Sequence, residues 1–243
     1  MRCALFSDVH GNLEALTAML SRLEAMGPID RWFCLGDIVG YGADPDDCCT
    51  LVRERADVTL LGNHDAAVAG RMDYDYYYDA ARDALDWCRE RLSPENMQWL
   101  GKLPYTHREE ELEISHGSPL RPEDYDYIFT TDQARDMVRS YDAAKVTFIG
   151  HSHLTKAFAV SEEDAEDVVS TKFKLRDGYR YVITVGSVGQ PRDYDPRACA
   201  GIYDSVSESF EFVRVDYDVD AQRQKINDAG LSPSFGTRLL LGI

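Results

Sequence analysis

The 243-residue chain is 44% hydrophobic and 28% charged, which fits a globular protein with a sizeable core and excludes a disordered or fibrous one. Its 26 Lys and Arg residues against 43 Asp and Glu residues give a formal net charge of -17, which disfavours binding of duplex nucleic acid. Since no run approaches the roughly 20 apolar residues of a membrane helix and Asp8 comes too early for a secretory signal, we expect one cytoplasmic domain over residues 1–243, without a membrane partner.

The first third of the sequence alternates strand-like and helix-like segments. Residues 2–7, 32–35 and 58–61 are short apolar runs that predict buried strands. Between them, Asn12 can cap a helix with leucines at helical spacing, and Pro45 opens a second helix in its first turn. Strands and helices that alternate in this way favour βαβ units and a mainly parallel sheet.

The middle of the chain carries a helical insertion at residues 72–103, which could act as a lid or pack against the domain. We predict one long helix through Trp87 and a short second one after Ser93. Strands at 111–115 and 146–149, with a helix at 132–140 between them, then predict a second sheet. A tyrosine cluster in the insertion could stack a nucleobase or line a lid, although a packed aromatic surface is the simpler interpretation; it comprises Tyr74, Tyr76, Tyr77 and Tyr78.

Beyond residue 153 the pattern changes to short strands and turns, which favours an antiparallel sheet. An acidic loop is expected at residues 161–167, and closing helices are expected at 218–226 and 232–241. The strands are predicted at 157–160, 171–175, 179–185, 201–203 and 210–215.

Polar clusters directly follow five of the predicted strands, in the segments FSDVHG, CLGDIVG, LLGNHD, ISHG and FIGHSH. Loops at the carboxyl ends of strands in an open α/β sheet converge on one crevice, so these clusters should meet in space. Five of the six histidines lie in them, and only His107, interpreted as a surface residue, lies outside. Carboxylate, amide and imidazole ligands without thiolates suit Mn, Fe, Zn or Ni rather than a structural zinc site.

The motifs DVH, GDIVG, GNHD, HG and GHSH, in this order, resemble those of the calcineurin-like metallophosphoesterase superfamily, and the resemblance covers residues 3–195. It implies an α/β fold of four αββα layers, a two-sheet mixed β-sandwich flanked by helices, with metals at the sheet edges. The segment VGSVGQPRD at 185–193 resembles one in the small bacterial and archaeal phosphodiesterases of this superfamily. Its glycines could admit an anion, or they could form a turn that supports the loop of His151 and His153.

By this resemblance, two divalent metal ions would bind side by side and share one carboxylate. Asp37 would bridge them because its two oxygens can each serve one cation. A hydroxide activated by the two ions would attack phosphorus, and His64 would face the leaving oxygen as a general acid or hydrogen-bond donor. One ion would be held by Asp8, His10, Asp37 and His153, and the other by Asp37, Asn63, His116 and His151.

The second motif departs from the family pattern. Protein phosphatases and many diadenosine tetraphosphate hydrolases of the superfamily carry an Asp-Arg pair where this chain has Gly40 and Tyr41. The Asp of that pair orients the acid histidine, and the Arg binds phosphate. We assign these two roles here to Asp65 and Arg192, with Arg192 as the substrate-binding residue.

We therefore predict a dinuclear metal-dependent phosphodiesterase or phosphomonoesterase that acts on a small phosphate ester, with the native metal and the oligomeric state left open. One alternative is a catalytically inactive protein-interaction module on the same fold, which would have little reason to retain His64. A second alternative, a dinucleoside polyphosphate hydrolase or a protein phosphatase, is disfavoured by the absent Asp-Arg pair.

Overall fold

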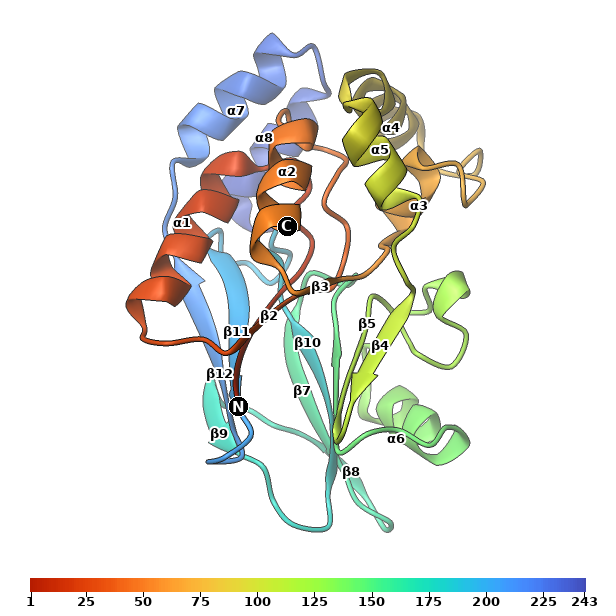
Figure 1. Ribbon diagram of the computed structural model, residues 1–243, viewed down its shortest axis with the longest axis vertical. Helices are drawn as coiled ribbons and strands as arrows, with labels where there is room; N and C mark the ends of the chain where they lie inside the picture. The colour runs from red at the N-terminus through yellow and green to blue at the C-terminus, as the bar shows by residue number, and fades with distance from the viewer.

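Two six-stranded sheets lie face to face in the computed structural model, which describes residues 1–243 (Figure 1). The strand order is β3-β2-β1-β11-β12-β9 in sheet A and β4-β5-β6-β10-β7-β8 in sheet B, and both sheets mix parallel and antiparallel pairs. The predicted mixed two-sheet sandwich is therefore confirmed. The strands are β1 (Arg2–Phe6), β2 (Arg31–Cys34), β3 (Val58–Thr59), β4 (Thr106–Glu109), β5 (Leu112–Ser115), β6 (Val146–Ile149), β7 (Thr155–Val160), β8 (Ala165–Asp167), β9 (Lys172–Lys174), β10 (Arg180–Val185), β11 (Ala198–Asp204) and β12 (Ser209–Val215).

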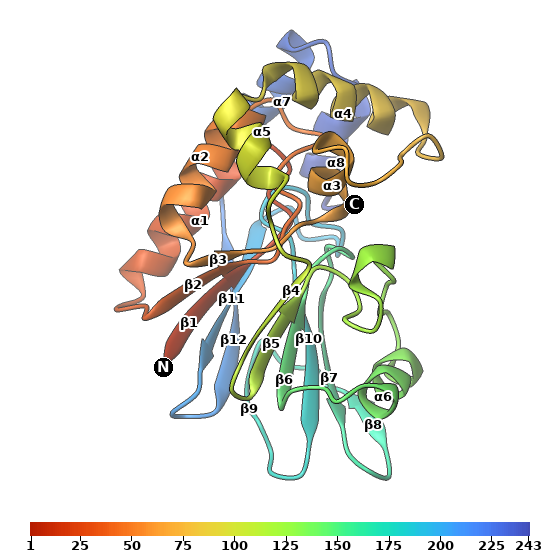
Figure 2. The ribbon, with the colours of Figure 1, turned by 45° about the vertical axis from the view of Figure 1, so that its right-hand side comes forward.

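Helices cover the outer face of each sheet, which gives the four αββα layers (Figure 2). The helices are α1 (Leu13–Ala25), α2 (Pro45–Arg55), α3 (Asn63–Val68), α4 (Asp79–Arg91), α5 (Pro94–Leu100), α6 (Thr131–Ser140), α7 (Val219–Asp228) and α8 (Pro233–Leu241). Here α1 and α2 lie against sheet A and α6 lies against sheet B, whereas α3, α4 and α5 gather beyond one end of the strands. None of the helices combines the length and the apolar character that crossing a bilayer requires.

Side-chain alternation along the strands separates the core between the sheets from the core beneath the helices. In β1, Cys3 and Leu5 belong to the cluster between the sheets, whereas Ala4 and Phe6 belong to the cluster that includes α1. The same alternation occurs in β2. Because these strands are buried on both faces, their sequences are continuous apolar runs, which is why the sequence pattern located them.

The second half of the chain does not form the separate antiparallel sheet that its pattern predicts. Instead, β7, β8 and β10 join sheet B, whereas β9, β11 and β12 join sheet A, and β10 runs parallel to β6. The expected acidic loop at 161–167 contains the edge strand β8, whose Glu166 and Asp167 are exposed. Charged side chains protect sheet edges from unwanted pairing, so an edge strand can have the composition of a loop.

The insertion at residues 72–103 is less helical than predicted. The long helix α4 begins only at Asp79, and residues 72–78 form turns. There, Asp73 Oδ1 accepts the backbone N–H of Asp75 at 3.0 Å, a local bond that competes with helix formation. The sequence pattern also missed two short elements, α3 and β4.

Replacement of Phe148 by Ala should strongly destabilise the fold. The Phe148 ring is fully buried between the sheets, with its centroid 5.5 Å from those of Tyr203 and Phe210. Removal of such a ring typically costs about 3–5 kcal/mol, and we expect this loss in the free energy of unfolding measured by urea denaturation with a chelator present. The control Val206→Ala, at a position 84% exposed, should change it by less than about 0.5 kcal/mol. A loss below about 1 kcal/mol for Phe148→Ala would contradict this description of the core.

Candidate metal centre

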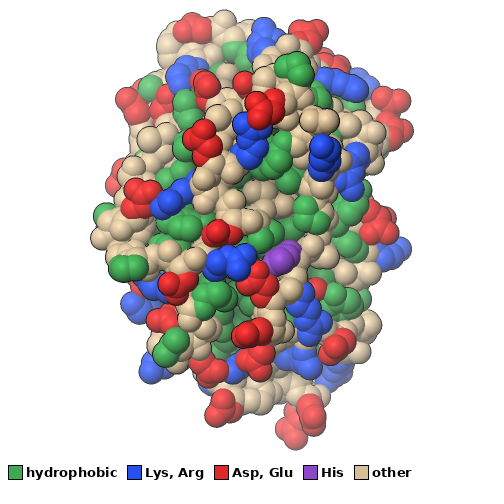
Figure 3. Space-filling model, in the orientation of Figure 1, with side chains coloured by type: hydrophobic (Ala, Val, Ile, Leu, Met, Phe, Trp, Pro, Cys, Tyr) green, Lys and Arg blue, Asp and Glu red, His purple; other side chains and the backbone are tan.

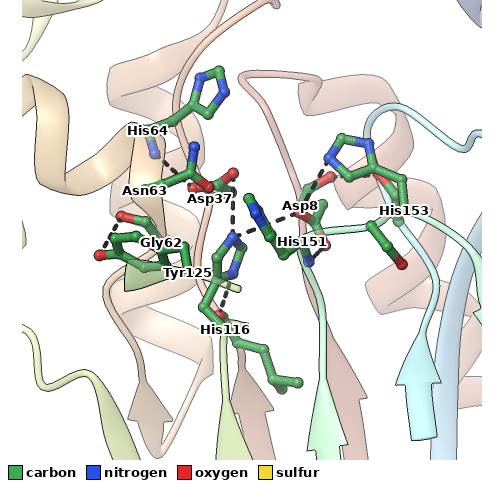
Figure 4. Close-up of polar contacts among 12 residues, drawn as sticks. Asp8, Asp37, Gly62, Asn63, His64, His116, Tyr125, His151 and His153 are labelled. Atoms are coloured by element: carbon green, nitrogen blue, oxygen red, sulfur yellow. Dashed lines mark hydrogen bonds and ion pairs between the residues drawn. The ribbon is translucent and has the colours of Figure 1, made fainter. Parts of the chain in front are cut away.

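The residues predicted to bind metal meet where the carboxyl ends of strands from both sheets come together (Figure 4). Asp8 and His10 follow β1, Asp37 follows β2, and Asn63 opens α3 just beyond β3. The other three predicted ligands come from sheet B, His116 after β5 and His151 and His153 after β6. The five clustered histidines are at most 8% exposed. The face in Figure 3 shows very little histidine surface, and acidic and basic side chains are mixed over it.

The first group consists of Asp8, His10, Asp37 and His153, whose ligand atoms all lie within 4.8 Å of one another. His153 Nε2 is 3.2 Å from Asp8 Oδ1, and His10 Nε2 is 3.7 Å from Asp37 Oδ2. Two carboxylates and two imidazoles are a suitable donor set for a divalent transition metal ion.

The second group consists of Asp37, His116 and His151, again with ligand atoms within 4.8 Å of one another. His116 Nε2 is 3.3 Å from Asp37 Oδ2, and the Asn63 side chain lies beside Asp37 in Figure 4. Asp37 therefore belongs to both groups. This is the arrangement that a bridging carboxylate requires.

Backbone carbonyl groups fix the orientation of three of these imidazoles. The Nδ1 atoms of His10, His116 and His153 lie 3.0, 2.8 and 2.6 Å from the carbonyl oxygens of Val39, Leu35 and Gln190. Each Nδ1 donates a proton to its carbonyl oxygen, so whenever the ring is neutral its Nε2 carries the lone pair that can bind a metal.

Several polar atoms of the centre have no partner within the protein. His10 Nε2 and His153 Nε2 face each other at 3.1 Å, and two unprotonated nitrogens repel unless a cation lies against both. Asp8 Oδ1, Asn63 Oδ1 and His116 Nε2 are buried without a hydrogen-bond partner. Unpaired buried donors and acceptors are rare, so this set of oxygens and nitrogens fits bound metal ions.

The backbone is strained at five of the seven proposed ligands. Their φ angles are positive, between 48° and 64°, a region that non-glycine residues rarely adopt; the residues are Asp8, His10, Asp37, His151 and His153. Such strain costs about 1–3 kcal/mol per residue and is typical of functional sites. All five residues lie in the loops that follow β1, β2 and β6.

Burial and neighbouring charges shift the pKa values of two proposed ligands in opposite directions. Burial lowers the pKa of His151 to about 3. Burial also acts to lower the pKa of His116, but the Asp37 carboxylate outweighs it and raises this pKa to about 9. The negative charge of Asp37 therefore attracts a proton that a metal ion would replace.

His64, the proposed acid, lies in the first turn of α3 directly against the two groups. Its backbone N–H donates to Asp37 Oδ1 at 2.8 Å, and its ring centroid is 4.9 Å from that of His10. Burial lowers the pKa of His64 to about 4, and its Nδ1 has no hydrogen-bond partner.

Gly40 explains why the Asp-Arg pair is absent from the second motif. It has a φ of +92°, and a Cβ atom at this position would come within 2.3 Å of His64 Nδ1. An aspartate here would therefore displace the histidine ring from its observed position. Tyr41 fills the adjacent space, with its ring centroid 4.7 Å from His10 and 4.6 Å from His64.

Asp65 does not take over the orienting role that we assigned to it. Its Oδ1 accepts the N–H groups of Ile38 and Val39 at 2.9 and 3.2 Å, and its Oδ2 accepts that of Gly62 at 3.1 Å. Asp65 thus joins the loop after β2 to the start of α3. It holds the backbone around Asp37 rather than the His64 ring.

Arg192, the residue assigned to substrate binding, lies beside the centre. Its Nη2 donates to Gln190 Oε1 at 2.9 Å, and its guanidinium carbon is 5.9 Å from the centroid of the Tyr41 ring. Its Nε is buried without a partner, and its positive charge, after burial, contributes to the lowered pKa of His153. The guanidinium therefore has free donor capacity close to the proposed ligands.

The VGSVGQPRD turn supports the ligand loops. The N–H of Gly189 and the hydroxyl of Ser187 both donate to the carbonyl oxygen of Asp8, at 2.8 and 2.9 Å. A Cβ atom on Gly189 would come within 1.8 Å of Val9 O, so only glycine permits this approach. These contacts favour the supporting role among the two that the sequence left open.

Three tyrosines contribute contacts that the sequence did not indicate. Tyr77 accepts a hydrogen bond from Asn63 Nδ2 at 2.5 Å, which directs Asn63 Oδ1 away from the hydroxyl. The Tyr125 hydroxyl donates to Gly62 O at 3.2 Å, and the Tyr127 ring stacks on His151 with centroids 4.0 Å apart. Of these three, only Tyr77 belongs to the tyrosine cluster noted in the sequence, and the sequence pattern did not indicate which residue it contacts.

Comparisons with known proteins agree with this geometry. Residues 1–184 match the model of the calcineurin-like phosphoesterase family. The chain is 37% identical over 243 residues to MJ0912, an uncharacterized protein of Methanocaldococcus jannaschii, with 98% of this chain and 97% of that one covered. The crystal structure of a metallophosphoesterase from Sphaerobacter thermophilus is similar with a TM-score of 0.86 at 35% identity, over 100% of this chain and 99% of that one. The hypothetical protein PH1004 from Pyrococcus horikoshii OT3, at 19% identity and with coverage of 100% and 98%, shares the fold with a TM-score of 0.79.

Replacement of Tyr77 by Phe should weaken metal binding. The change removes the hydroxyl that holds the Asn63 amide, and loss of such a supporting partner typically reduces metal affinity about 10–100-fold. We expect a reduction in this range for one of two Mn(II) equivalents in a calorimetric titration. The matched control is Tyr74→Phe, which removes a hydroxyl that bonds Asp86 on the surface and should leave both affinities unchanged. If Tyr77→Phe and Tyr74→Phe bind Mn(II) with the same affinities, Tyr77 does not position Asn63.

Proposed function

This chain belongs to the calcineurin-like phosphoesterase family of metal-dependent phosphoesterases, and from that premise we propose that it hydrolyses a small phosphomonoester or phosphodiester with two divalent metal ions. The observation that carries the proposal is the membership of Asp37 in both ligand groups. One shared carboxylate places two cations side by side while offsetting part of their repulsion.

The proposed ligands have definite chemical preferences. Oxygen and imidazole donors accept Mn, Fe, Zn or Ni, and we propose that the centre binds two ions from this set. Such a pair, when bound, activates water and neutralises phosphoryl oxygens during in-line displacement. Asp8, His10 and His153 would complete the first site with Asp37, and Asn63, His116 and His151 would complete the second.

The remaining roles fall to His64 and Arg192. His64 is buried, adjoins both ligand groups through Asp37, and carries no competing hydrogen bond on Nδ1. We assign it the delivery of a proton or a hydrogen bond to the leaving oxygen. Arg192 has an unpaired buried Nε and would bind a phosphoryl oxygen, since guanidinium groups match the geometry of phosphate.

Replacement of Asp37 by Ala should abolish turnover. The variant lacks the ligand shared by both groups, so neither ion would be held in place. We expect hydrolysis of p-nitrophenyl phosphate and of bis(p-nitrophenyl) phosphate, in the presence of Mn(II), to fall at least about 1,000-fold. Asp177→Ala, at an exposed turn, serves as the control. Unchanged activity of Asp37→Ala would refute the proposed function, and absence of metal-dependent turnover in the unmodified protein would favour a non-catalytic interaction module.

Replacement of His64 by Asn should affect poor leaving groups much more than good ones. An acid that protonates the leaving oxygen contributes typically about 100–10,000-fold, whereas p-nitrophenolate departs with little help. We expect kcat for phenyl phosphate to fall at least about 100-fold and kcat for p-nitrophenyl phosphate to fall less than about 10-fold. Metal content measured by emission spectrometry should remain that of the unmodified protein. Equal losses for both esters would assign His64 a structural role instead.

A further inference from the structure

A pocket of about 460 Å³ adjoins the metal centre, and two proposed ligands, Asn63 and His151, form part of its lining. The other walls come from the turns before α4, at residues 76–78, and from residues 124–127. Figures 1 and 2 both show these two segments on the same side of the molecule, beyond the carboxyl ends of the strands. A group bound in this pocket would therefore be close enough to be bonded to the reacting phosphate.

The pocket is lined by tyrosines that remain exposed to solvent. Tyr76, Tyr78 and Tyr127 are 74%, 51% and 43% exposed. Tyr127 stacks on His151, and Phe129, itself 39% exposed, stacks on Tyr127 with centroids 4.9 Å apart. Large aromatic surfaces left exposed beside a site are typical of ligand binding, and flat rings favour flat partners.

The charged side chains that line the pocket are carboxylates, which accept hydrogen bonds, rather than cations. Asp124 and Asp126 contribute to the lining, and no Lys or Arg does. Arg121 approaches only Oδ2 of each carboxylate, at 3.2 Å in both cases, so Oδ1 of each remains available as an acceptor. This charge would repel a second phosphate but would accept hydrogen bonds from ring N–H or amino groups.

We propose that this pocket binds a nucleobase, so that the substrate is a nucleoside phosphate ester with its phosphate at the metal centre and its base among the tyrosines. The placement of the phosphate rests on the proposed function, whereas the binding of the base rests on the pocket alone. A volume of 460 Å³ lies within the usual range for small-molecule sites and is large enough for a nucleoside.

Adenosine and ribose are the probes that separate base binding from phosphate chemistry, because neither carries a phosphate. In calorimetric titrations of the full chain we expect adenosine to bind at least about 10-fold more tightly than ribose, since stacking of a base on aromatic side chains contributes roughly this factor or more. With Mn(II) present, AMP should inhibit p-nitrophenyl phosphate hydrolysis at least about 10-fold more strongly than ribose 5-phosphate. Equal affinities within either pair would overturn the proposal.

The variant Tyr76→Ala tests the stacking wall. Its side chain is largely exposed, so the substitution should leave the fold intact, which circular dichroism can verify. We expect the affinity for adenosine to fall at least about 5-fold. The matched control is Tyr179→Ala, an aromatic position that precedes β10 at the opposite end of sheet B and should retain the original affinity. Unchanged adenosine binding by Tyr76→Ala would contradict the assignment.

Further outcomes distinguish this inference from the proposed function. If adenosine binds and Tyr76→Ala weakens it while no phosphate ester is hydrolysed with any metal tested, the nucleobase pocket stands and the proposed function fails. If phosphate esters are hydrolysed but adenosine binds no better than ribose, the pocket assignment alone fails. Inhibition by phenyl phosphate as strong as that by AMP would assign the pocket to simple aromatic rings and overturn the nucleobase.

Discussion

The buried charge of Asp37 is the constraint on which the rest of the centre depends. This carboxylate is 1% exposed, accepts the N–H of His64 through Oδ1, and faces the imidazoles of His10 and His116 through Oδ2. An ionised group in such a position costs several kcal/mol unless donors and cations surround it. Loops from both sheets therefore converge on this one side chain. They place hydrogen-bond donors and imidazoles around its negative charge.

Two kinds of contact hold the residues around Asp37 in place: one orients the imidazole rings, and the other fixes the backbone. The backbone carbonyl oxygens of Val39, Leu35 and Gln190 lie within hydrogen-bond distance of the imidazole Nδ1 atoms. The Asp65 carboxylate accepts three backbone N–H groups close to Asp37. Positive φ angles at five proposed ligands then cost about 1–3 kcal/mol each. The apolar cores on both faces of sheet A and sheet B offset that cost, so the rigid sandwich allows a strained and densely charged edge to persist.

Sequence patterns located the centre because its ligands follow the most predictable elements of the fold. β1, β2 and β6 are short apolar runs, and each is followed at once by its polar cluster. The rest depends on contacts between distant segments. Pairing partners, not composition, make β8 a strand and divide the last strands between two sheets. Likewise, nothing in the sequence connects Tyr77 to Asn63 or Tyr127 to His151, since these contacts exist only once the loops have converged.

The presence of Gly40 and Tyr41 in place of the Asp-Arg pair changes what surrounds the His64 ring and which residue supplies a positive charge. Without a side chain at residue 40, the His64 ring occupies the space that an aspartate would take. It packs against the rings of Tyr41 and His10 instead of bonding to a carboxylate. Arg192 supplies a positive charge nearby, with its guanidinium carbon 5.9 Å from the centroid of the Tyr41 ring. The adjoining pocket presents aromatic rings and carboxylates where polyphosphates would need cations. The metal centre and the pocket beside it therefore support the proposal of an ester with one phosphate and an uncharged, planar substituent.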